Sequence, residues 1–292
     1  MGAKLKKKSY FEGWYLKHQK DDHVICFIPA INIDNKGKRS GSIQIITENA
    51  AYHVDCKETK LIDDNLTVIF DGNIFSSKGI VVDIHTEELT VKGKIKYGDL
   101  QPLSHDAMGC FSYAPFMECC HGIVSLCHNL IGSLVVNGTE IDFTDGVGYI
   151  EKDKGISFPK KYLWTQCNYK TTCNNCIVVA VAEIPFLLTR FRGTLAFLYV
   201  EGKEYRLATY LGARVRKYTR EEVIITQGQL VLRIKLYLEK NFNYHSLKAP
   251  ISGAMIRDIK EWPQCKVRYT LYQNKDKIID VRNLFALAEW VD

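Results

Sequence analysis

Residues 146–168, with the sequence GVGYIEKDKGISFPKKYLWTQCN, contain two strand-like pieces on either side of a turn. The turn carries Gly155, Ser157 and Pro159, which are residue types that favour chain reversal. The aromatic and β-branched residues around it favour extended structure. This stretch therefore predicts two short strands joined by a turn.

The same stretch contains acidic, aromatic and amide side chains at alternate positions. Alternate side chains of an extended strand share a face. The first piece is expected to place three side chains on one face: Tyr149, Glu151 and Asp153. The second piece is expected to do the same with Trp164, Gln166 and Asn168. These faces can converge on one cavity. The alternative is a set of solvated edge residues beside a loop, because most Glu and Asp side chains are exposed.

Short strands continue on both sides of this stretch. Asn137-Gly138 is typical of a tight hairpin turn between 123–136 and 139–143. Residues 229–238 alternate apolar and polar side chains, as in a half-buried antiparallel strand. The other expected strands are 10–17, 23–33, 42–47, 51–55, 66–70, 80–85, 89–97, 162–169, 177–184, 193–200, 204–211, 223–226, 265–272, 277–281 and 284–291. No long segment keeps a helical period, so the sequence predicts an all-β antiparallel sandwich or barrel with little helix.

Residues 98–121 interrupt the run of strands with a long, partly apolar loop. Loops of this length in compact domains often cover or line a site, so a lid or a barrel-end plug is expected. The loop ends at Glu118-Cys119-Cys120-His121. Glu118 is taken as a ligand contact. His121 is a candidate proton relay or contact to a phenol. The alternative for His121 is a histidine satisfied by the backbone at the loop end.

Composition and charge narrow the function classes. The 292 residues are 46% hydrophobic and 25% charged, which is ordinary for a globular protein with a real core. A net charge of +6 is modest for this length and predicts no nucleic-acid binding. No stretch reaches the ~18 consecutive apolar residues of a membrane span. The basic residues at 4–8 predict a solvated tail, with weak contact to a membrane surface as the alternative.

Ten cysteines without a signal peptide predict reduced thiols and a cytoplasmic location. Cys173-Asn-Asn-Cys176 has the spacing of a zinc pair, but a second matching pair is missing. A hairpin turn at the two asparagines is the better interpretation, so no metal is expected. Phosphate-binding glycine motifs and a serine-nucleophile motif are also missing, which argues against nucleotide cofactors and serine-hydrolase chemistry.

The central stretch resembles the signature of the tocopherol cyclase-like family and, more distantly, a segment of carotenoid hydratases. The resemblance is carried by Gly148-Tyr149-Ile150-Glu151-Lys152-Asp153-x-Gly155, Ser157-Phe158-Pro159 and Trp164-x-Gln166-Cys167-Asn168. It extends to Tyr10-Phe11-Glu12-Gly13-Trp14-Tyr15, Arg206-Leu207-Ala208-Thr209-Tyr210 and Ala286-Leu287-Ala288-Glu289, and so covers nearly the whole chain. It implies two lipocalin-like β-barrel domains, at residues 1–157 and 158–292, around an apolar ligand site.

The chemistry that the resemblance implies is protonation of an isoprenoid double bond without a cofactor. The tertiary cation is then captured by an internal phenol in a cyclase or by water in a hydratase. Such a site needs a buried carboxylic acid that stays protonated near neutral pH, aromatic faces and a dry cavity. Glu151 occupies the position of the family acid, with Asp153 second. Tyr149 and Trp164 are the expected aromatic walls.

The remaining ligand contacts implied are Gln166 and Asn168, which would bind a polar head group, and Trp14 of the N-terminal motif. Lys154 departs from the pattern, because the family has Trp before the glycine. Glu12 and Glu289 enter the site by family position or are ordinary surface acids. Two other functions stay open: a non-catalytic carrier or sensor of a hydrophobic molecule, and a structural or partner-binding module with a filled interior.

Overall fold

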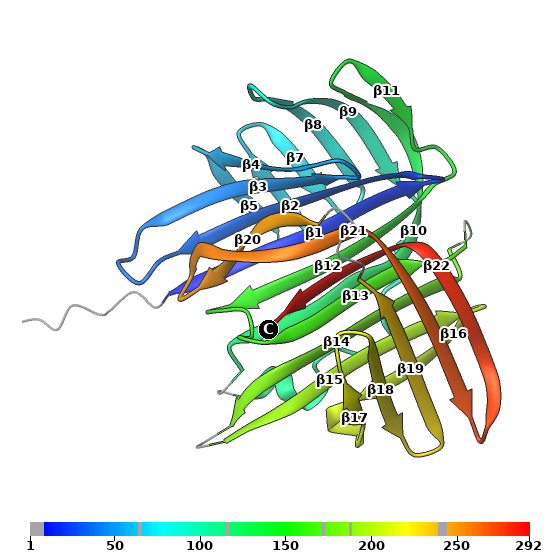
Figure 1. Ribbon diagram of the computed structural model, residues 1–292. Helices are drawn as coiled ribbons and strands as arrows, with labels where there is room; N and C mark the ends of the chain where they lie inside the picture. The colour runs from blue at the N-terminus through cyan, green and yellow to red at the C-terminus, as the bar shows by residue number, and fades with distance from the viewer. Residues whose placement is uncertain (1–8, 64–65, 115–116, 171–172, 187–188, 239–243) are drawn as a thin grey trace, which may run out of the picture.

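A computed structural model of the chain describes residues 9–63, 66–114, 117–170, 173–186, 189–238 and 244–292. The described part is built from β-strands, with two short 3-10 helices, η1 (Gly109–Tyr113) and η2 (Thr209–Leu211). The strands form two antiparallel sheets that each curl toward a barrel, which confirms the predicted all-β double-barrel fold (Figure 1). The basic residues 4–8 lie outside the described residues. Among the described residues there is no helix long and apolar enough to cross a membrane.

In the described part of the chain, the first sheet has 12 strands in the order β4-β3-β2-β1-β12-β10-β9-β8-β7-β6-β5, with β11 paired to β10. Its curl brings β3 against β5 and β6 at the ends of the sheet. A Cβ on Gly41 would lie 2.1 Å from Thr59 Cγ2, so glycine is required for this approach. The strands are β1 (Tyr10–Lys20), β2 (His23–Ile33), β3 (Arg39–Thr47), β4 (Ala51–Cys56), β5 (Thr59–Asp63), β6 (Thr67–Phe70), β7 (Asn73–Ser76), β8 (Gly79–His85), β9 (Thr90–Tyr97), β10 (Cys119–Val136), β11 (Thr139–Asp142) and β12 (Val147–Gly155).

The second sheet, over the residues that the structure describes, has 10 strands in the order β16-β15-β14-β13-β22-β21-β19-β18-β17, with β20 paired to β21. The predicted hairpin across Cys173–Cys176 is confirmed, because β13 and β14 pair antiparallel. The strands are β13 (Tyr162–Asn168), β14 (Asn175–Phe186), β15 (Thr189–Val200), β16 (Lys203–Ala208), β17 (Arg214–Tyr218), β18 (Glu222–Gln227), β19 (Leu230–Tyr237), β20 (His245–Ile251), β21 (Ala254–Gln273) and β22 (Asp276–Val291). The domain limit at residue 157 stays a prediction.

Each barrel interior is packed with aliphatic and aromatic side chains. Phe27, Phe70 and Phe75 fill the first interior, and residues such as Leu198 and Ile234 fill the second. Burying one such side chain stabilises the fold by roughly 1.5–3 kcal/mol. In β19 the buried and exposed residues alternate, as the sequence predicts for a half-buried strand.

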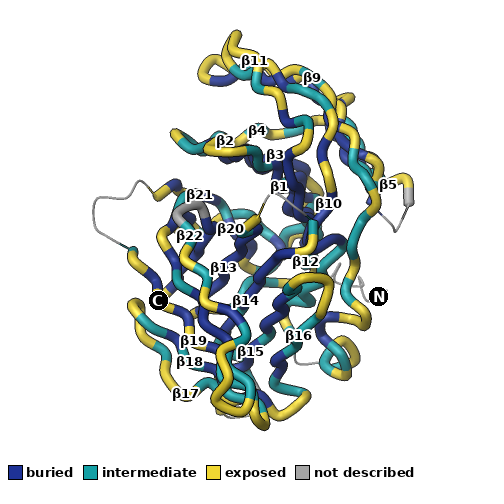
Figure 2. Tube along the Cα trace, turned by 90° about the vertical axis from the view of Figure 1, so that its right-hand side faces the viewer, coloured by how far each residue is buried: buried dark blue, intermediate teal, exposed yellow. Residues whose placement is uncertain are grey.

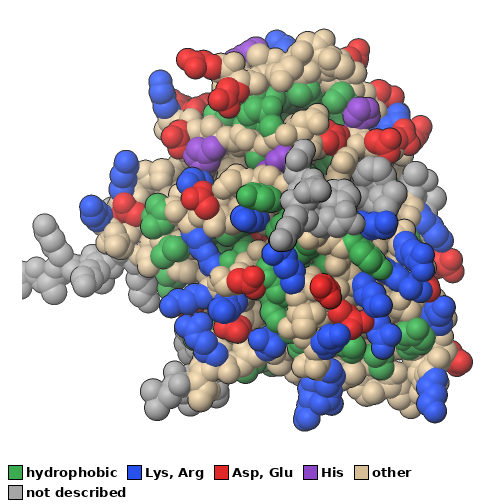
Figure 3. Space-filling view, in the orientation of Figure 1, with side chains coloured by type: hydrophobic (Ala, Val, Ile, Leu, Met, Phe, Trp, Pro, Cys, Tyr) green, Lys and Arg blue, Asp and Glu red, His purple; other side chains and the backbone are tan. Residues whose placement is uncertain are grey.

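Lys and Arg side chains are scattered over the outer surface of the second barrel, interspersed with Asp and Glu (Figure 3).

A third apolar cluster joins the two barrels where β1, β12 and β13 meet. All seven residues of β13 are buried, so both of its faces are covered. One face packs into the second barrel through Leu163 and Cys167. The other face contributes Tyr162 and Trp164 to the joining cluster, together with Tyr15 and Tyr149 of the first barrel. The trace of β13 is buried along its length (Figure 2). The two barrels therefore share a continuous buried junction.

A long hairpin reaches from the second barrel across to the first. This arm consists of β20 and the first half of β21, residues 245–264 (Figure 1). Gln44 Nε2 donates to the carbonyl of Lys248 (2.9 Å), and the amide of Lys248 donates to Gln44 Oε1 (2.6 Å). His245 Nε2 adds a contact to the carbonyl of Thr47 (3.1 Å). The arm was missing from the predicted strands, and it forms one wall of the site.

Candidate functional site: an acidic cavity between the barrels

A cavity of about 170 Å³ lies between the two barrels and not inside either one. Its lining is mostly apolar and aromatic, with contributions from both sheets. Leu247, Pro250 and Ile259 of the arm cover one side, while Met108, Phe111 and Met117 of the loop 98–118 cover another. The loop therefore lines the site, as predicted. The stretch 146–168 borders this cavity, and residues of both barrels surround it.

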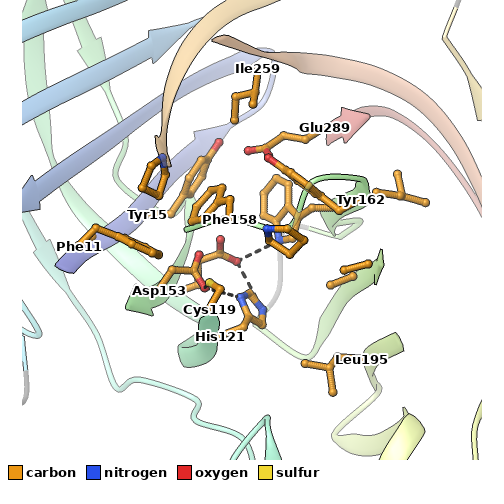
Figure 4. Close-up of a pocket in the computed structure, with 18 of the residues that line it drawn as sticks. Phe11, Tyr15, Cys119, His121, Asp153, Phe158, Tyr162, Leu195, Ile259 and Glu289 are labelled. Atoms are coloured by element: carbon orange, nitrogen blue, oxygen red, sulfur yellow. Dashed lines mark hydrogen bonds and ion pairs between the residues drawn. The ribbon is translucent and has the colours of Figure 1, made fainter. Parts of the chain in front are cut away.

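Glu151, Asp153 and His121 form a compact group on the cavity wall, the histidine cluster (Figure 4). Antiparallel pairing of β10 and β12 sets His121 directly opposite Asp153. His121 Nδ1 lies 2.9 Å from Asp153 Oδ1, and its Nε2 lies 3.9 Å from Glu151 Oε2. Because residues 151 and 153 share a strand face, both carboxyl groups reach the same histidine.

Two further side chains fix the carboxyl group of Glu151. Tyr149 Oη donates to Glu151 Oε2 (2.6 Å), and Trp164 Nε1 donates to the same oxygen (3.1 Å). The residues predicted to share strand faces thus meet at one carboxyl group. The junction between the barrels creates this contact, because Tyr149 belongs to β12 and Trp164 to β13.

Burial sets the protonation of the histidine cluster. Glu151 is only 5% exposed, and this desolvation raises its pKa to about 8, although nearby His121 acts in the opposite direction. Burial also disfavours the charged form of His121, but Asp153 and Glu151 outweigh it and raise the pKa of His121 to about 9. The cluster therefore holds exchangeable protons at neutral pH, in an environment that excludes most water.

Comparison with known protein families assigns most of the chain. The family model described as tocopherol cyclase-like matches residues 68–284, which include β10, β12 and β13.

The chain belongs to the tocopherol cyclase-like family.

Two solved structures resemble this family member in fold. Kievitone hydratase from Nectria haematococca aligns with a TM-score of 0.55 and 13% identity, over 98% of this chain and 89% of that one. A putative AttH from Nitrosomonas europaea aligns with a TM-score of 0.53 and 11% identity, over 99% and 94% of the two chains. A search of curated proteins gave no match. At such low identity the likeness establishes the fold alone.

Within this member of the tocopherol cyclase-like family, most of the predicted site residues gather at the cavity. Glu151, Asp153, His121, Trp164 and Trp14 line it. Trp14 is fully buried in β1. Tyr149 lies behind the lining and acts through its hydrogen bond to Glu151.

Three predicted ligand contacts lie elsewhere. Gln166 Oε1 accepts a hydrogen bond from the buried Lys17 Nζ (2.9 Å), so it bridges the two barrels. Asn168 Nδ2 donates to the carbonyl of Leu126 (3.2 Å) at the same junction. Neither residue lines the cavity, and Gln166 Nε2 donates to Asn168 Oδ1 (2.7 Å). Glu118 is exposed, and its carbonyl accepts from the amide of Ile156 (2.8 Å).

Lys154 does not interrupt the cavity wall. Residues 151 and 153 face inward, so strand alternation turns residue 154 outward. Lys154 is exposed and borders a separate outer hollow beside the loop 98–118. The departure from the family pattern at this position therefore removes no aromatic side chain from this cavity.

Sequence reasoning left a second acidic group unassigned. Glu289 lines the cavity and accepts a hydrogen bond from Tyr162 Oη, while Glu261 behind it accepts one from Tyr15 Oη (2.5 Å). Tyr162 is detectable in the sequence, because it shares the strand face of Trp164. Glu289 belongs to the family-like motif Ala286-Leu287-Ala288-Glu289, but its sequence context fits an ordinary surface acid equally well. Glu261 gave no signal, because its strand was not predicted.

The histidine cluster is also the group of described residues whose chemistry suits a cation. The ligand atoms of His121, Glu151 and Asp153 lie within 4.8 Å of one another. Their hydrogen bonds to each other, to Tyr149 and to Trp164 account for the arrangement without an ion. The absence of a metal stays a prediction.

Proposed function

We propose that the protein is a cofactor-independent enzyme that protonates a carbon–carbon double bond in a prenylated or other isoprenoid substrate. The observation that carries the proposal is the buried carboxyl group of Glu151, held by two donors at the wall of an apolar cavity. Membership of the tocopherol cyclase-like family and the fold shared with a protein named as a hydratase support the same class of reaction.

In this mechanism Glu151 is the general acid. Its Oε2 already accepts hydrogen bonds from Tyr149 and Trp164, which leaves Oε1 to carry the transferable proton. Transfer of this proton to the less substituted alkene carbon breaks the π bond and leaves a tertiary cation. The aromatic faces of Tyr15, Phe158 and Trp164 line the cavity and stabilise such a cation.

The second step captures the cation. Water adds to it in a hydration, or a phenol oxygen of the substrate adds to it in a cyclisation. The oxygen then loses a proton, which returns to Glu151 either directly or through His121, whose Nε2 lies 3.9 Å away. The hydrogen bond from His121 to Asp153 fixes the ring for this transfer. The net reaction consumes one water or none and requires no redox partner.

A cytoplasmic location also remains a proposal. All ten cysteines are free thiols, and several are buried. Free thiols in this number suit a reducing compartment.

The test is turnover of prenylated phenols by the purified protein in deuterated water. Protonation at carbon predicts a product with one carbon-bound deuterium, which has gained one water in a hydration or is an isomer of the substrate in a cyclisation. Glu151→Gln should slow the reaction by about 10²- to 10⁴-fold but still bind the substrate. The matched control is Glu88→Gln, at an exposed position in the first barrel. Deuterium incorporation that is unaffected by Glu151→Gln would rule out this acid.

A carrier of hydrophobic molecules is the competing function. The apolar lining suits it, but a carrier gains nothing from a carboxyl group whose burial costs free energy. Stoichiometric binding of isoprenoids, with no turnover by the wild-type protein, would favour the carrier.

A further inference from the structure

A pair of buried carboxyl groups lies across the cavity from the histidine cluster. Glu261 on β21 and Glu289 on β22 are directly opposite each other in the antiparallel register. Glu261 is fully buried and Glu289 is 8% exposed. Only Glu289 lines the cavity, where it lies with Tyr162 opposite Asp153 and His121 (Figure 4). We refer to Glu261 and Glu289 as the carboxyl pair.

Each carboxyl group of the pair accepts a hydrogen bond from a tyrosine. Tyr15 Oη donates to Glu261 Oε1, and Tyr162 Oη donates to Glu289 Oε2. Glu261 Oε2 is buried and receives no donor among the described residues, and the strand register sets Glu261 directly opposite Glu289. Ionised carboxylates only accept hydrogen bonds. Because two buried carboxyl groups set opposite each other resist double ionisation, the pair favours a state that keeps at least one proton.

Among the described residues, no cation forms an ion pair with the carboxyl pair. The titratable and charged groups facing it are Tyr15 and Lys17 on β1, Cys26 on β2, Glu151 and Asp153 on β12, Tyr162 on β13 and Arg257 on β21. Lys17 Nζ donates to Gln166, and Arg257 donates to the carbonyl groups of Pro159 and Lys160. No ion pair to Glu261 or Glu289 is present in the described part of the chain. Burial accordingly raises the pKa of Glu289 to about 7 and that of Glu261 well above its usual range.

We infer that the carboxyl pair is the subsite for the polar head of the ligand, and that this head is a neutral hydroxyl group, such as that of a phenol. A hydroxyl group donates a hydrogen bond to Glu289, whose carboxyl group faces the cavity. An anionic head is rejected, because the pair already retains a negative charge whenever it has lost one of its two protons, and Glu151 and Asp153 lie across the cavity. The ligand would thus run from a hydroxyl head at Glu289 to an alkenyl chain near Glu151.

This assignment rests on the proposed function only for the position of the double bond. In it, Glu289 and Tyr162 contact the head group of the ligand. Gln166 and Asn168, which were predicted for that role, instead form hydrogen bonds with Lys17 and with the carbonyl of Leu126. It also defines specificity: a hydroxyl group that is methylated loses the donated hydrogen bond and leaves Glu289 unpaired beside an apolar group.

The experiment measures binding in the Glu151→Gln protein, so that no turnover interferes. The probes are a prenylated phenol, its methyl ether, and the same skeleton with a carboxylate in place of the hydroxyl, titrated by calorimetry. The ether is expected to bind at least about tenfold more weakly than the phenol, as for a lost hydrogen bond to a charged group. The carboxylate is expected to bind more weakly still. Adding Glu289→Gln should abolish the preference for phenol, whereas adding Glu88→Gln should preserve it.

Infrared spectroscopy supplies a readout that does not depend on a ligand. At neutral pH the Glu151→Gln protein should show the band of a protonated carboxyl group, and Glu261→Gln should remove it without unfolding the protein. The inference is overturned if the phenol does not bind, if phenol and ether bind equally, if the preference survives Glu289→Gln, or if the band is missing. Failure of the proposed function would instead appear as absent turnover in the wild-type protein, with these binding differences intact.

Discussion

The cavity has two acidic walls that differ in the groups that surround them. The histidine cluster combines Glu151 with two hydrogen-bond donors and with His121, which becomes a cation when protonated. The carboxyl pair has tyrosine donors but no ion-pair partner among the described residues. Buried carboxyl groups therefore lie in two different environments on opposite sides of the same cavity.

This difference separates proton transfer from recognition. A carboxyl group beside a histidine can release a proton and regain it, because the histidine stabilises each charge state in turn. A carboxyl pair without a cation resists full ionisation and holds its proton. The first wall is suited to chemistry and the second to binding a neutral polar group.

The sharpest test of this contrast is mutation of one acid on each wall. Glu151→Gln should lower kcat by about 10²- to 10⁴-fold, the range for loss of a general acid. Glu289→Gln should act mainly on KM, because it removes ground-state binding. Steady-state kinetics on a prenylated phenol checks both variants. Equal losses of kcat in the two variants would break the contrast.

The pH dependence of stability should distinguish the two walls next. The raised pKa of Glu289 means that its stabilisation is complete below about pH 4.5 and is lost as the pH rises through 7. The raised pKa of His121 means that its stabilisation is complete below about pH 6.5 and is lost as the pH rises through 9.

Urea unfolding of the wild-type protein and of Glu289→Gln, across pH 4 to 10, measures these windows. The free energy of unfolding of the variant, relative to wild type, should rise by about 3 kcal/mol between pH 4.5 and 7. His121→Gln should change the curve only in the higher window. A wild-type protein that gains stability from pH 5 to 7 would contradict the protonated carboxyl pair.

A smaller effect is expected from the arm that carries Glu261. Gln44→Ala removes both hydrogen bonds to the backbone of Lys248 and should lower the free energy of unfolding by about 1–3 kcal/mol. Hydrogen exchange should rise in β20 and leave β10 and β12 unchanged. Gln229→Ala, at an exposed turn, is the control. Faster exchange across both walls alike would show that the arm does not act locally.

No effect is expected from removal of metal ions. The histidine cluster has the donor set for a cation and the carboxyl pair lacks the histidine, so any bound metal would be found at His121. Metal analysis of the purified protein and assays after chelation check this. A stoichiometric metal, with activity lost on chelation and restored by one cation, would replace the proton-transfer role of this wall.

Much of the architecture and one of the two walls could be predicted from the sequence. Turn chemistry at sites such as Asn137-Gly138 marked the hairpins, and strand alternation correctly grouped Tyr149, Glu151 and Asp153. The strands of the arm were not predicted, because Pro250 and Pro263 interrupt the strand pattern of the sequence. Proline is tolerated on an edge strand such as β20 and at a bulge, and the pairing of β21 with β22 shifts between Trp262 and Cys265.

The inter-barrel position of the cavity could not be predicted for a different reason. Strand alternation identifies faces but does not say what covers them. Gln166 and Asn168 share a face with Trp164, as expected, yet the first barrel supplies Lys17 and the Leu126 carbonyl to them. Such partners depend on how the barrels pack, which no local pattern encodes.

The junction between the barrels also fixes when the site comes into being during synthesis. Tyr15 and Glu261 are 246 positions apart, and Tyr162 and Glu289 are 127 apart. Contacts between such distant residues form late and slowly, because long loops must close first. The first barrel has all its strands once residue 155 has left the ribosome, but its half of the cavity then lies open. Until β22 arrives, the nascent chain presents this apolar surface to chaperones and to other nascent chains.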